Sequence, residues 1–394
     1  MSVMRVLTGN GAVAFAVKQT KPDVVVSSPV TPSSSILENI ATYISDGEID
    51  SEFVNFESEY SAISACIGAS AAGGRVFTAT ASRGLSMSQE ALFQLASLRL
   101  PVVLAVTNRA ISSPTNIFAD HSDAMAQRDC GWIQIYSENP QEAYDNIIQA
   151  FKIAEHLEVR TPIMIGLDGF ITSHTMENVL VEEDGEVGDF VERMTTDFSL
   201  LDTERPVTMG SVAMPDYYFE HKIHQEQGIE SSRKIIRDVG KEFGDRFGRY
   251  YGNFETYKLE DAEYGIVLIG SSAGTAKEVT DQLRSKGEKV GVLKLRVFRP
   301  FPYKEVREAL GRLTAIGVLD RSFAPGSFGG PLFTEIRSTL FDLEKKPLVH
   351  PFVYGLGGRE INRKHIEDVF MGLKSIEDNG KKEIEVSFIN LRTE

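Results

Sequence analysis

The chain has 394 residues, of which 42% are hydrophobic and 25% charged, and its formal net charge at pH 7 is −15. This length predicts two or three folded domains, and the negative charge argues against nucleic acid or an anionic membrane surface as a partner. The two cysteines, Cys66 and Cys130, are too few for a disulfide framework or an iron–sulfur cluster. We read neither a signal peptide nor an apolar run of membrane-spanning length, and we expect a cytoplasmic protein.

The first 210 residues alternate short apolar runs with helix-like stretches. Strands are predicted at Val24–Val26, Glu52–Phe56, Arg75–Thr80, Pro101–Val106, Trp132–Tyr136 and Pro162–Leu167. Helices are predicted between them at Ser34–Asp46, Glu59–Ala72, Met87–Leu98 and Pro140–Leu157. Strands that alternate with helices and are rich in β-branched residues are typical of a parallel, doubly wound sheet. We therefore expect an α/β domain over residues 1–210.

A charged segment separates this domain from a second α/β unit. Residues 216–249 contain few apolar side chains and are predicted to form a helix within a connecting segment, residues 211–258. Three further strands follow, at Gly265–Gly270, Val290–Arg296 and Ala315–Asp320. A helix that ends at Gly287 is predicted between the first two, and a helix at Lys304–Leu313 between the last two. The sequence thus predicts a second parallel-sheet domain over residues 259–394.

Polar side chains follow four predicted strands of the first domain. Thr31 follows the first, Glu59 the second, Arg83 the third and Arg109 the fourth. Ligands of open parallel sheets bind beyond the carboxyl ends of the strands, where these side chains are expected to meet. A guanidinium can hold a carboxylate by two parallel hydrogen bonds, so this edge is a candidate pocket for a small anion.

Each of these residues also has a structural explanation. Glu59 is an acid in the first turn of a helix, where the helix dipole favours a negative charge. Arg109 could pair with Asp120 or Asp123, and Thr31 could serve a turn or cap ahead of the next helix. From position alone, both explanations stay open.

Two other motifs favour a structural role. His121 lies between Asp120 and Asp123, but no further metal ligand is near in sequence, so a hydrogen-bonded histidine is the preferred interpretation. The glycine-rich run Gly355–Arg359 could bind an anion through its backbone, yet a sharp chain reversal explains it better.

Several motifs, in order along nearly the whole chain, resemble those of the 2-oxoacid:ferredoxin oxidoreductases. They are Pro29-Val-Thr-Pro-Ser-Ser34, Glu57-Ser-Glu59, Ala65-Cys-Ile-Gly-Ala-Ser70, Asn108-Arg-Ala110, Asp120-His-Ser-Asp123, Gln127-Arg-Asp-Cys-Gly-Trp132, Phe243-Gly-Asp-Arg-Phe-Gly-Arg249, Val297-Phe-Arg-Pro-Phe-Pro302 and Gly355-Leu-Gly-Gly-Arg359. Single motifs are weak, but the ordered set is specific. The chain most resembles the alpha subunit of the multi-subunit pyruvate synthases.

This resemblance implies a fold and a set of roles. The first domain would have the thiamine-diphosphate pyrimidine-binding fold, and the second a transketolase C-terminal-like fold. Glu59 matches the glutamate that hydrogen-bonds the aminopyrimidine ring, and Pro29 and Ser82 are expected to contact the cofactor. Arg109 matches the anchor of the substrate carboxylate, and Thr31 the residue that bonds the substrate near its carbonyl.

The resemblance also implies partners, because parts of such an enzyme are missing from this sequence. No Gly-Asp-Gly…Asn signature is present for the magnesium diphosphate, and we assign no metal ligand to this chain. A beta subunit would carry the diphosphate, the Mg²⁺ and a [4Fe-4S] cluster, while a ferredoxin-like subunit carries further clusters and a gamma subunit completes the complex. Coenzyme A would be the co-substrate and an external ferredoxin the electron acceptor.

The substrate is predicted less directly than the reaction class. Ser28 replaces an expected aromatic residue, and Arg83 adds a charge at an expected neutral position, so 2-oxoisovalerate or 2-oxoglutarate stays open beside pyruvate. A non-catalytic scaffold is another reading, against which the trio of Thr31, Glu59 and Arg109 argues. An NAD-dependent dehydrogenase would need a glycine fingerprint after the first strand, and a transketolase-type enzyme would need no electron-carrying partners.

Overall fold

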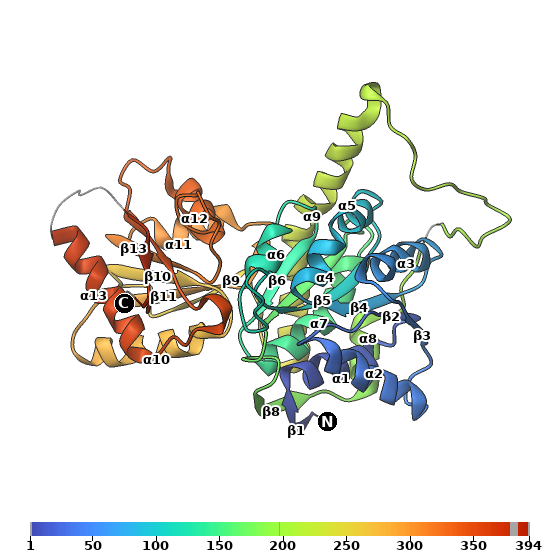
Figure 1. The fold of residues 1–394 in the computed structure, drawn as a ribbon, viewed down its shortest axis with the longest axis horizontal. Helices are drawn as coiled ribbons and strands as arrows, with labels where there is room; N and C mark the ends of the chain where they lie inside the picture. Colours follow the sequence, from blue (N-terminus) through green and yellow to red (C-terminus); the bar gives the residue numbers. More distant parts are fainter. Residues whose placement is uncertain (1, 197, 379–384, 393–394) are drawn as a thin grey trace.

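The computed structural model describes residues 2–196, 198–378 and 385–392 and contains two large sheets covered by helices (Figure 1). The first sheet has seven strands in the order β12-β6-β7-β5-β4-β2-β3. Its strands are β2 (Val24–Ser27), β3 (Glu52–Asn55), β4 (Val76–Thr80), β5 (Val102–Asn108), β6 (Ile133–Ser137), β7 (Ile163–Asp168) and β12 (Val297–Arg299). All are parallel except β12, which pairs antiparallel with β6. The predicted doubly wound sheet is confirmed.

Helices bury both faces of this sheet. The cluster on one face includes apolar side chains of α1 (Gly9–Thr20), α2 (Ser34–Ser45), α7 (Pro140–Glu155), α8 (Asp184–Val191) and α9 (Pro215–Phe247). The cluster on the other face includes those of α3 (Glu59–Ala71), α4 (Ser82–Met87), α5 (Gln89–Ser97) and α6 (Ser122–Ala126). Adjacent strand residues such as Val25 and Val26 join opposite clusters, as the two-residue period of a strand requires.

An antiparallel ribbon of β1 (Val3–Thr8) and β8 (Met176–Val181) lies outside the large sheets. The helix after β1 was not predicted. Eleven of the twelve residues of α1 are buried, so it shows no polar face and no amphipathic period.

The helix predicted at residues 216–249 is confirmed as α9. Its buried residues begin at Gln225 and include Ile236 and Phe243, whereas its amino-terminal part extends away from the other helices (Figure 1). Gly248, with a φ of 77°, ends the helix in the left-handed conformation that glycine adopts without steric cost. No described helix is long and apolar enough to cross a membrane.

The second sheet has six strands in the order β15-β14-β13-β10-β11-β9. They are β9 (Phe254–Tyr257), β10 (Tyr264–Leu268), β11 (Val290–Leu295), β13 (Ala315–Asp320), β14 (Leu348–Val353) and β15 (Ser387–Phe388), with β9 antiparallel to β11. The helices are α10 (Ser272–Ser285), α11 (Tyr303–Leu310), α12 (Pro331–Leu340) and α13 (Arg363–Asp378), with a short 3-10 turn at Leu356–Gly358. The two sheets are connected by β12, which leaves the second unit and joins the first sheet.

Candidate functional site

The four loops that carry the predicted site residues lie at one edge of the first sheet. Strands β5, β4, β2 and β3 are consecutive neighbours and parallel, so their carboxyl ends are side by side. The structure therefore brings the segments around Thr31, Glu59, Ser82 and Arg109 together. This edge is the candidate active site.

Arg109 and Thr31 are in direct contact. The Nη1 atom of Arg109 donates a hydrogen bond of 2.5 Å to the backbone carbonyl oxygen of Thr31. Thr31 itself is exposed. Arg109 is 5% exposed, and its Nε atom is buried without a hydrogen-bond partner in the described structure. Burial and the nearby charge of Arg83 lower the pKa of Arg109.

The side chain of Arg109 is thus a buried cation. The proposed ion pair with Asp120 or Asp123 is not formed among the described residues, because Asp123 accepts from the backbone N–H of Arg109 rather than from its guanidinium. Since a buried charge is costly unless it is paired, this guanidinium favours an anionic ligand.

Glu59 begins α3 and is partly exposed. The preceding residue, Ser58, caps the helix by accepting a hydrogen bond from Ser61 N, which fixes the first turn. A Cβ atom placed on Gly84 would lie 3.0 Å from Glu59 Oε1 and 2.4 Å from Thr80 Oγ1. Only glycine therefore fits between the Glu59 carboxylate and the Thr80 hydroxyl, and this buried hydroxyl has no hydrogen-bond partner among the described residues.

Ser82 and Pro29, the two other predicted cofactor contacts, differ in exposure. Pro29 is exposed beside the site, whereas Ser82 is fully buried with a φ of 43°. The Ser82 hydroxyl donates a 2.6 Å hydrogen bond to the carbonyl oxygen of Ala110. This bond fixes the loop after β5 to the loop after β4, and a cofactor contact by the same hydroxyl would have to replace it or share its oxygen.

Asp123 holds the site loops together, a role that the sequence analysis missed. Its fully buried carboxylate accepts hydrogen bonds of 2.7–3.0 Å from the backbone N–H of Ser82, Arg109 and Ala124, and from the side chain of Asn108. Burial raises its pKa to about 6. The Asp120-His-Ser-Asp123 motif contained this residue, but its partners lie 14 and 41 residues away in sequence.

His121 has the structural role that the sequence favoured. Its Nε2 atom lies 2.5 Å from Asp168 Oδ1, and both side chains are buried. Asp168 also pairs with Arg321 at 2.9 Å and accepts from the backbone N–H of Ser271. Burial alone would raise the pKa of Asp168, but Arg321 and His121 outweigh it and hold that pKa well below its usual range.

The glycine-rich run is a chain reversal at the contact between the two halves, as predicted. Gly357 has a φ of 60°, and its N–H donates to Asp120 Oδ2. A Cβ on Gly357 would lie 2.6 Å from Asn116 Nδ2, and one on Gly358 2.3 Å from Phe118 Cβ. Glycine is required here because the turn lies directly against the loop after β5.

Ser28 and Arg83, the two residues that depart from the expected family pattern, differ in exposure. Ser28 is 7% exposed beneath the Thr31 loop, whereas Arg83 is exposed and adds positive charge near Arg109.

One group of carboxylates within reach of a common ion exists among the described residues, at Glu138, Glu142 and Glu255. Lys294 lies within salt-bridge distance of all three carboxylates, and Lys277 pairs with Glu138 and Glu255, so two lysines already occupy the ion-pairing positions around this group.

Comparisons with known proteins agree with this geometry. Residues 15–241 match the family model described as pyruvate flavodoxin/ferredoxin oxidoreductase, thiamine diP-bdg, and residues 262–366 match the pyruvate:ferredoxin oxidoreductase core domain II. A pyruvate synthase subunit PorA of Thermotoga maritima is 46% identical over 92% of this chain and 93% of its own length. A ketoisovalerate oxidoreductase subunit VorA of Pyrococcus horikoshii is 40% identical over 99% of this chain and 98% of its own.

Solved structures support the fold. A 2-oxoglutarate:ferredoxin oxidoreductase from Magnetococcus marinus superposes with a TM-score of 0.73 at 17% identity, covering 95% of this chain and 65% of that one. An inactive split-gene transketolase superposes with a TM-score of 0.56 at 12% identity, covering 94% and 99%. The predicted order, a pyrimidine-binding-like domain followed by a transketolase C-terminal-like domain, is confirmed. The chain belongs to the pyruvate:ferredoxin/flavodoxin oxidoreductase family.

Proposed function

We propose that this chain is the alpha subunit of a thiamine-diphosphate-dependent 2-oxoacid:ferredoxin oxidoreductase that acts on pyruvate. The reaction converts pyruvate and coenzyme A into acetyl-CoA and CO2, transfers two electrons to ferredoxin and is reversible. The observation that carries the proposal is the buried Arg109 guanidinium, which has no carboxylate partner in the part of the chain that the structure describes and lies at the same sheet edge as Glu59. Relatives named pyruvate synthase subunit PorA, at up to 46% identity, support pyruvate.

The residues at this edge fit the pyrimidine half of thiamine diphosphate. Gly84 packs directly against Glu59 and fixes the position of its side chain, and the buried Thr80 hydroxyl next to it lacks a partner in the described structure. When bound, the cofactor supplies a carbon nucleophile for the 2-oxo group and an electron sink for decarboxylation. Glu59 would hold the pyrimidine ring and keep a proton at the ring nitrogen that it contacts.

Arg109 and Thr31 would position the substrate. The guanidinium can receive the pyruvate carboxylate through Nε and a neighbouring N–H, which gives the two-bond geometry that arginine favours. The exposed Thr31 would place its hydroxyl near the carbonyl. Loss of CO2 removes the charge that Arg109 holds, so this contact is stronger before the bond breaks than after it.

This chain would supply half of the site. Its family relatives are named as subunits, and the sequence lacks the diphosphate signature and a cysteine quartet. A beta subunit would provide the Mg²⁺ diphosphate site and a [4Fe-4S] cluster, and a ferredoxin-like subunit would pass electrons to external ferredoxin. A gamma subunit would complete this cytoplasmic complex. Glu59, half-exposed at the sheet edge, would face the cofactor across that interface.

The test is anaerobic, CoA-dependent viologen reduction by the purified complex. Arg109→Ala should lower kcat/KM for pyruvate by about 100-fold, since it removes charge-assisted hydrogen bonds of about 1.5–3 kcal/mol each. Glu59→Gln should lower kcat while the cluster absorbance stays unchanged. Arg205→Ala, an exposed arginine paired with Asp202, is the matched control and should leave both constants unchanged.

The same assay separates the competing functions. Pyruvate, 2-oxobutyrate, 2-oxoisovalerate and 2-oxoglutarate are compared, because the VorA relative and the changed residues Ser28 and Arg83 keep other substrates open. A preference for 2-oxoisovalerate would mean that 2-oxoisovalerate, and not pyruvate, is the substrate of the enzyme. No turnover with any 2-oxoacid, from a complex that retains clusters and thiamine diphosphate, would contradict it and favour a scaffold.

A further inference from the structure

The carboxylate of Asp123 joins the loops after β4 and β5 at the candidate site. Its Oδ2 atom accepts hydrogen bonds of 3.0 Å from the backbone N–H of Ser82, which follows β4, and from that of Arg109, which follows β5. Its Oδ1 atom accepts from the side-chain amide of Asn108 at 2.8 Å and from the N–H of Ala124 at 2.7 Å. One fully buried side chain therefore fixes the backbone of both loops.

All four partners of the Asp123 carboxylate are hydrogen-bond donors. An ionised carboxylate has about four acceptor positions, and here each oxygen uses two of them. No acceptor position is left for a guanidinium, which explains why Arg109 bonds this carboxylate through its backbone and not through its side chain. Asparagine cannot replace Asp123 without loss, because in either orientation its amide NH2 group would face two N–H donors.

This arrangement leaves the Arg109 side chain open to a ligand while a negative charge stays nearby. Nη1 is bonded to the carbonyl oxygen of Thr31, whereas the buried Nε atom has no hydrogen-bond partner among the described residues. Burial and the charge of Arg83 lower the pKa of Arg109, and the charge of Asp123 raises it. Asp123 thus offsets part of the guanidinium charge without occupying its N–H groups.

We propose that Asp123 is a positioning residue that holds Arg109 in place for the substrate. Its carboxylate fixes the Arg109 backbone relative to the Ser82 loop and offsets the guanidinium charge, and the guanidinium stays open to the carboxylate of a 2-oxoacid. This inference rests on the proposed function, since it assumes that Arg109 binds the substrate. Asp123 itself touches neither substrate nor cofactor and acts through the residues that it bonds.

The ionisation of Asp123 gives this role a measurable consequence. Complete burial raises its pKa to about 6, although its four hydrogen bonds act in the opposite direction. A carboxyl oxygen that carries a proton becomes a donor and no longer accepts from two N–H groups. The KM for pyruvate should therefore rise as the pH falls through 6, because fewer molecules then hold Arg109 in position.

Other charged and titratable groups lie on the elements around α6. They are Arg83 on α4, Arg109 after β5, Tyr136 on β6 and His121 directly before α6. Burial raises the pKa of Tyr136, which keeps its hydroxyl protonated in this pH range. Because Asp123→Asn retains all four groups, the difference between its pH profile and that of the wild type reports on Asp123 alone.

The test measures kcat and KM of the purified complex for pyruvate between pH 5 and 8, at saturating thiamine diphosphate and coenzyme A. At pH 7.5, Asp123→Asn should raise KM by about tenfold or more, change kcat less, and leave KM nearly independent of pH. Asn108→Ala keeps Asp123 and removes one donor that favours its ionised form. The rise in KM should then begin at a pH that is about one unit higher than in the wild type.

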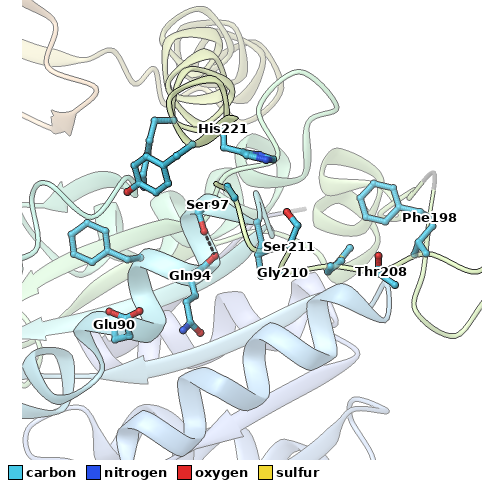
Figure 2. Close-up of a pocket in the computed structure, with 15 residues that line it drawn as sticks. Glu90, Gln94, Ser97, Phe198, Thr208, Gly210, Ser211 and His221 are labelled. Carbon is cyan, nitrogen blue, oxygen red and sulfur yellow. Dashed lines mark hydrogen bonds between the residues drawn. The ribbon is translucent and has the colours of Figure 1, made fainter. Parts of the chain in front are cut away.

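Glu90→Gln is the matched control, because it also removes one negative charge. Glu90 is exposed and lines a groove between α5 and α9, which contains none of the residues that we assign to the site (Figure 2). Its KM should equal that of the wild type at every pH.

The variants also distinguish failure of this inference from failure of the proposed function. A folded Asp123→Asn complex whose KM follows the pH as in the wild type would overturn the positioning role. If Asp123→Asn does not fold, an Asn108→Ala profile that coincides with the wild type would overturn it equally. An unchanged kcat/KM in Arg109→Ala would instead contradict the proposed function itself.

Discussion

Gly84 is packed so closely in the candidate site that a side chain at this position would clash with its neighbours. A methyl group there would lie 2.4 Å from Thr80 Oγ1 and 2.8 Å from Glu59 Cγ, which is closer than real Cβ contacts. We predict that Gly84→Ala displaces the Glu59 side chain from its position. The concentration of thiamine diphosphate that gives half-maximal activity in the reconstituted complex should rise by about tenfold or more, because small displacements in an active site are costly.

Gly188→Ala is the matched control for this substitution. Gly188 is also in a helix, α8, and no atom lies within 4 Å of the position its Cβ would take. Alanine there should leave the cofactor requirement unchanged and stabilise the helix by about 0.5–1 kcal/mol. If Gly84→Ala behaves like Gly188→Ala in the activation assay, the close packing of Gly84 against Glu59 is not needed for the cofactor.

At the residue scale, the sequence predicted the site residues that follow neighbouring strands but not those that hold other loops in place through long-range contacts. Thr31, Glu59 and Arg109 follow neighbouring strands, so the rule that ligands bind at strand carboxyl ends was enough to bring them together. Thr80 and Asp123 act through space on residues from other loops. No local pattern distinguishes such a buried hydroxyl or carboxylate from an ordinary strand or helix residue.

At the scale of elements, Asp320 at the end of β13 caps α12. Its carboxylate oxygens accept hydrogen bonds of 2.9 and 3.0 Å from the backbone N–H of Leu332 and Phe333. Complete burial raises its pKa to about 7, although the two N–H groups act in the opposite direction. An aspartate in the unfolded chain has a pKa of about 3.9.

This shift predicts a pH dependence of stability. Between pH 4 and 7 the folded state keeps a proton on Asp320 that the unfolded state has lost, so the free energy of unfolding falls as the pH rises through this window. Asp320→Asn cannot titrate. Near pH 5 the folded Asp320 carboxyl is neutral, and the asparagine replaces one of its two acceptor oxygens by an amide N–H donor. Because only the wild-type protein loses stability as the pH rises, the deficit of the variant should be largest near pH 5 and shrink by on the order of 2 kcal/mol by pH 8.

Chemical denaturation of the two proteins at pH 5, 6, 7 and 8 measures this difference. Asp342→Asn, at an exposed position beyond the other end of the same helix, should change stability little at any of these values. A deficit for Asp320→Asn that grows with pH would show that the carboxylate is more stable in the folded state than its burial implies.

Short apolar runs predicted the buried strands and amphipathic periodicity predicted several helices, but one helix that is buried on nearly all sides was missed. The strands β2 to β7 and the helix α9 agree with their predictions to within a few residues. By contrast, α1 is buried against α2 and α7 and has no polar stripe to reveal its period. The partner of β12 was also unpredictable, because antiparallel pairing with β6 is set by how the two halves meet.

At the scale of the whole molecule, the two halves are joined by a strand, a glycine turn and a buried ion network. Asp168 ends β7 of the first sheet, and Arg321 follows β13 of the second. Their side chains are 1% and 2% exposed, so the 2.9 Å pair is isolated from water. The Ser271 hydroxyl, also from the second half, donates to the same carboxylate at 2.5 Å. This network connects loops at the carboxyl ends of both sheets.

We predict that Arg321→Met weakens the contact between the two halves and lowers the free energy of unfolding. Methionine keeps the apolar stem but leaves Asp168 without its main counter-charge, and removing one partner of a buried pair costs about 3–5 kcal/mol. Denaturant unfolding should show this loss, and limited proteolysis near residue 259 should become faster because the second half opens more often. Lys364→Met, which removes an exposed pair with Asp368, should cost less than about 0.5 kcal/mol. Equal effects of the two substitutions would mean that β12 and the glycine turn suffice to hold the halves together, and that the buried network contributes specificity of docking rather than stability.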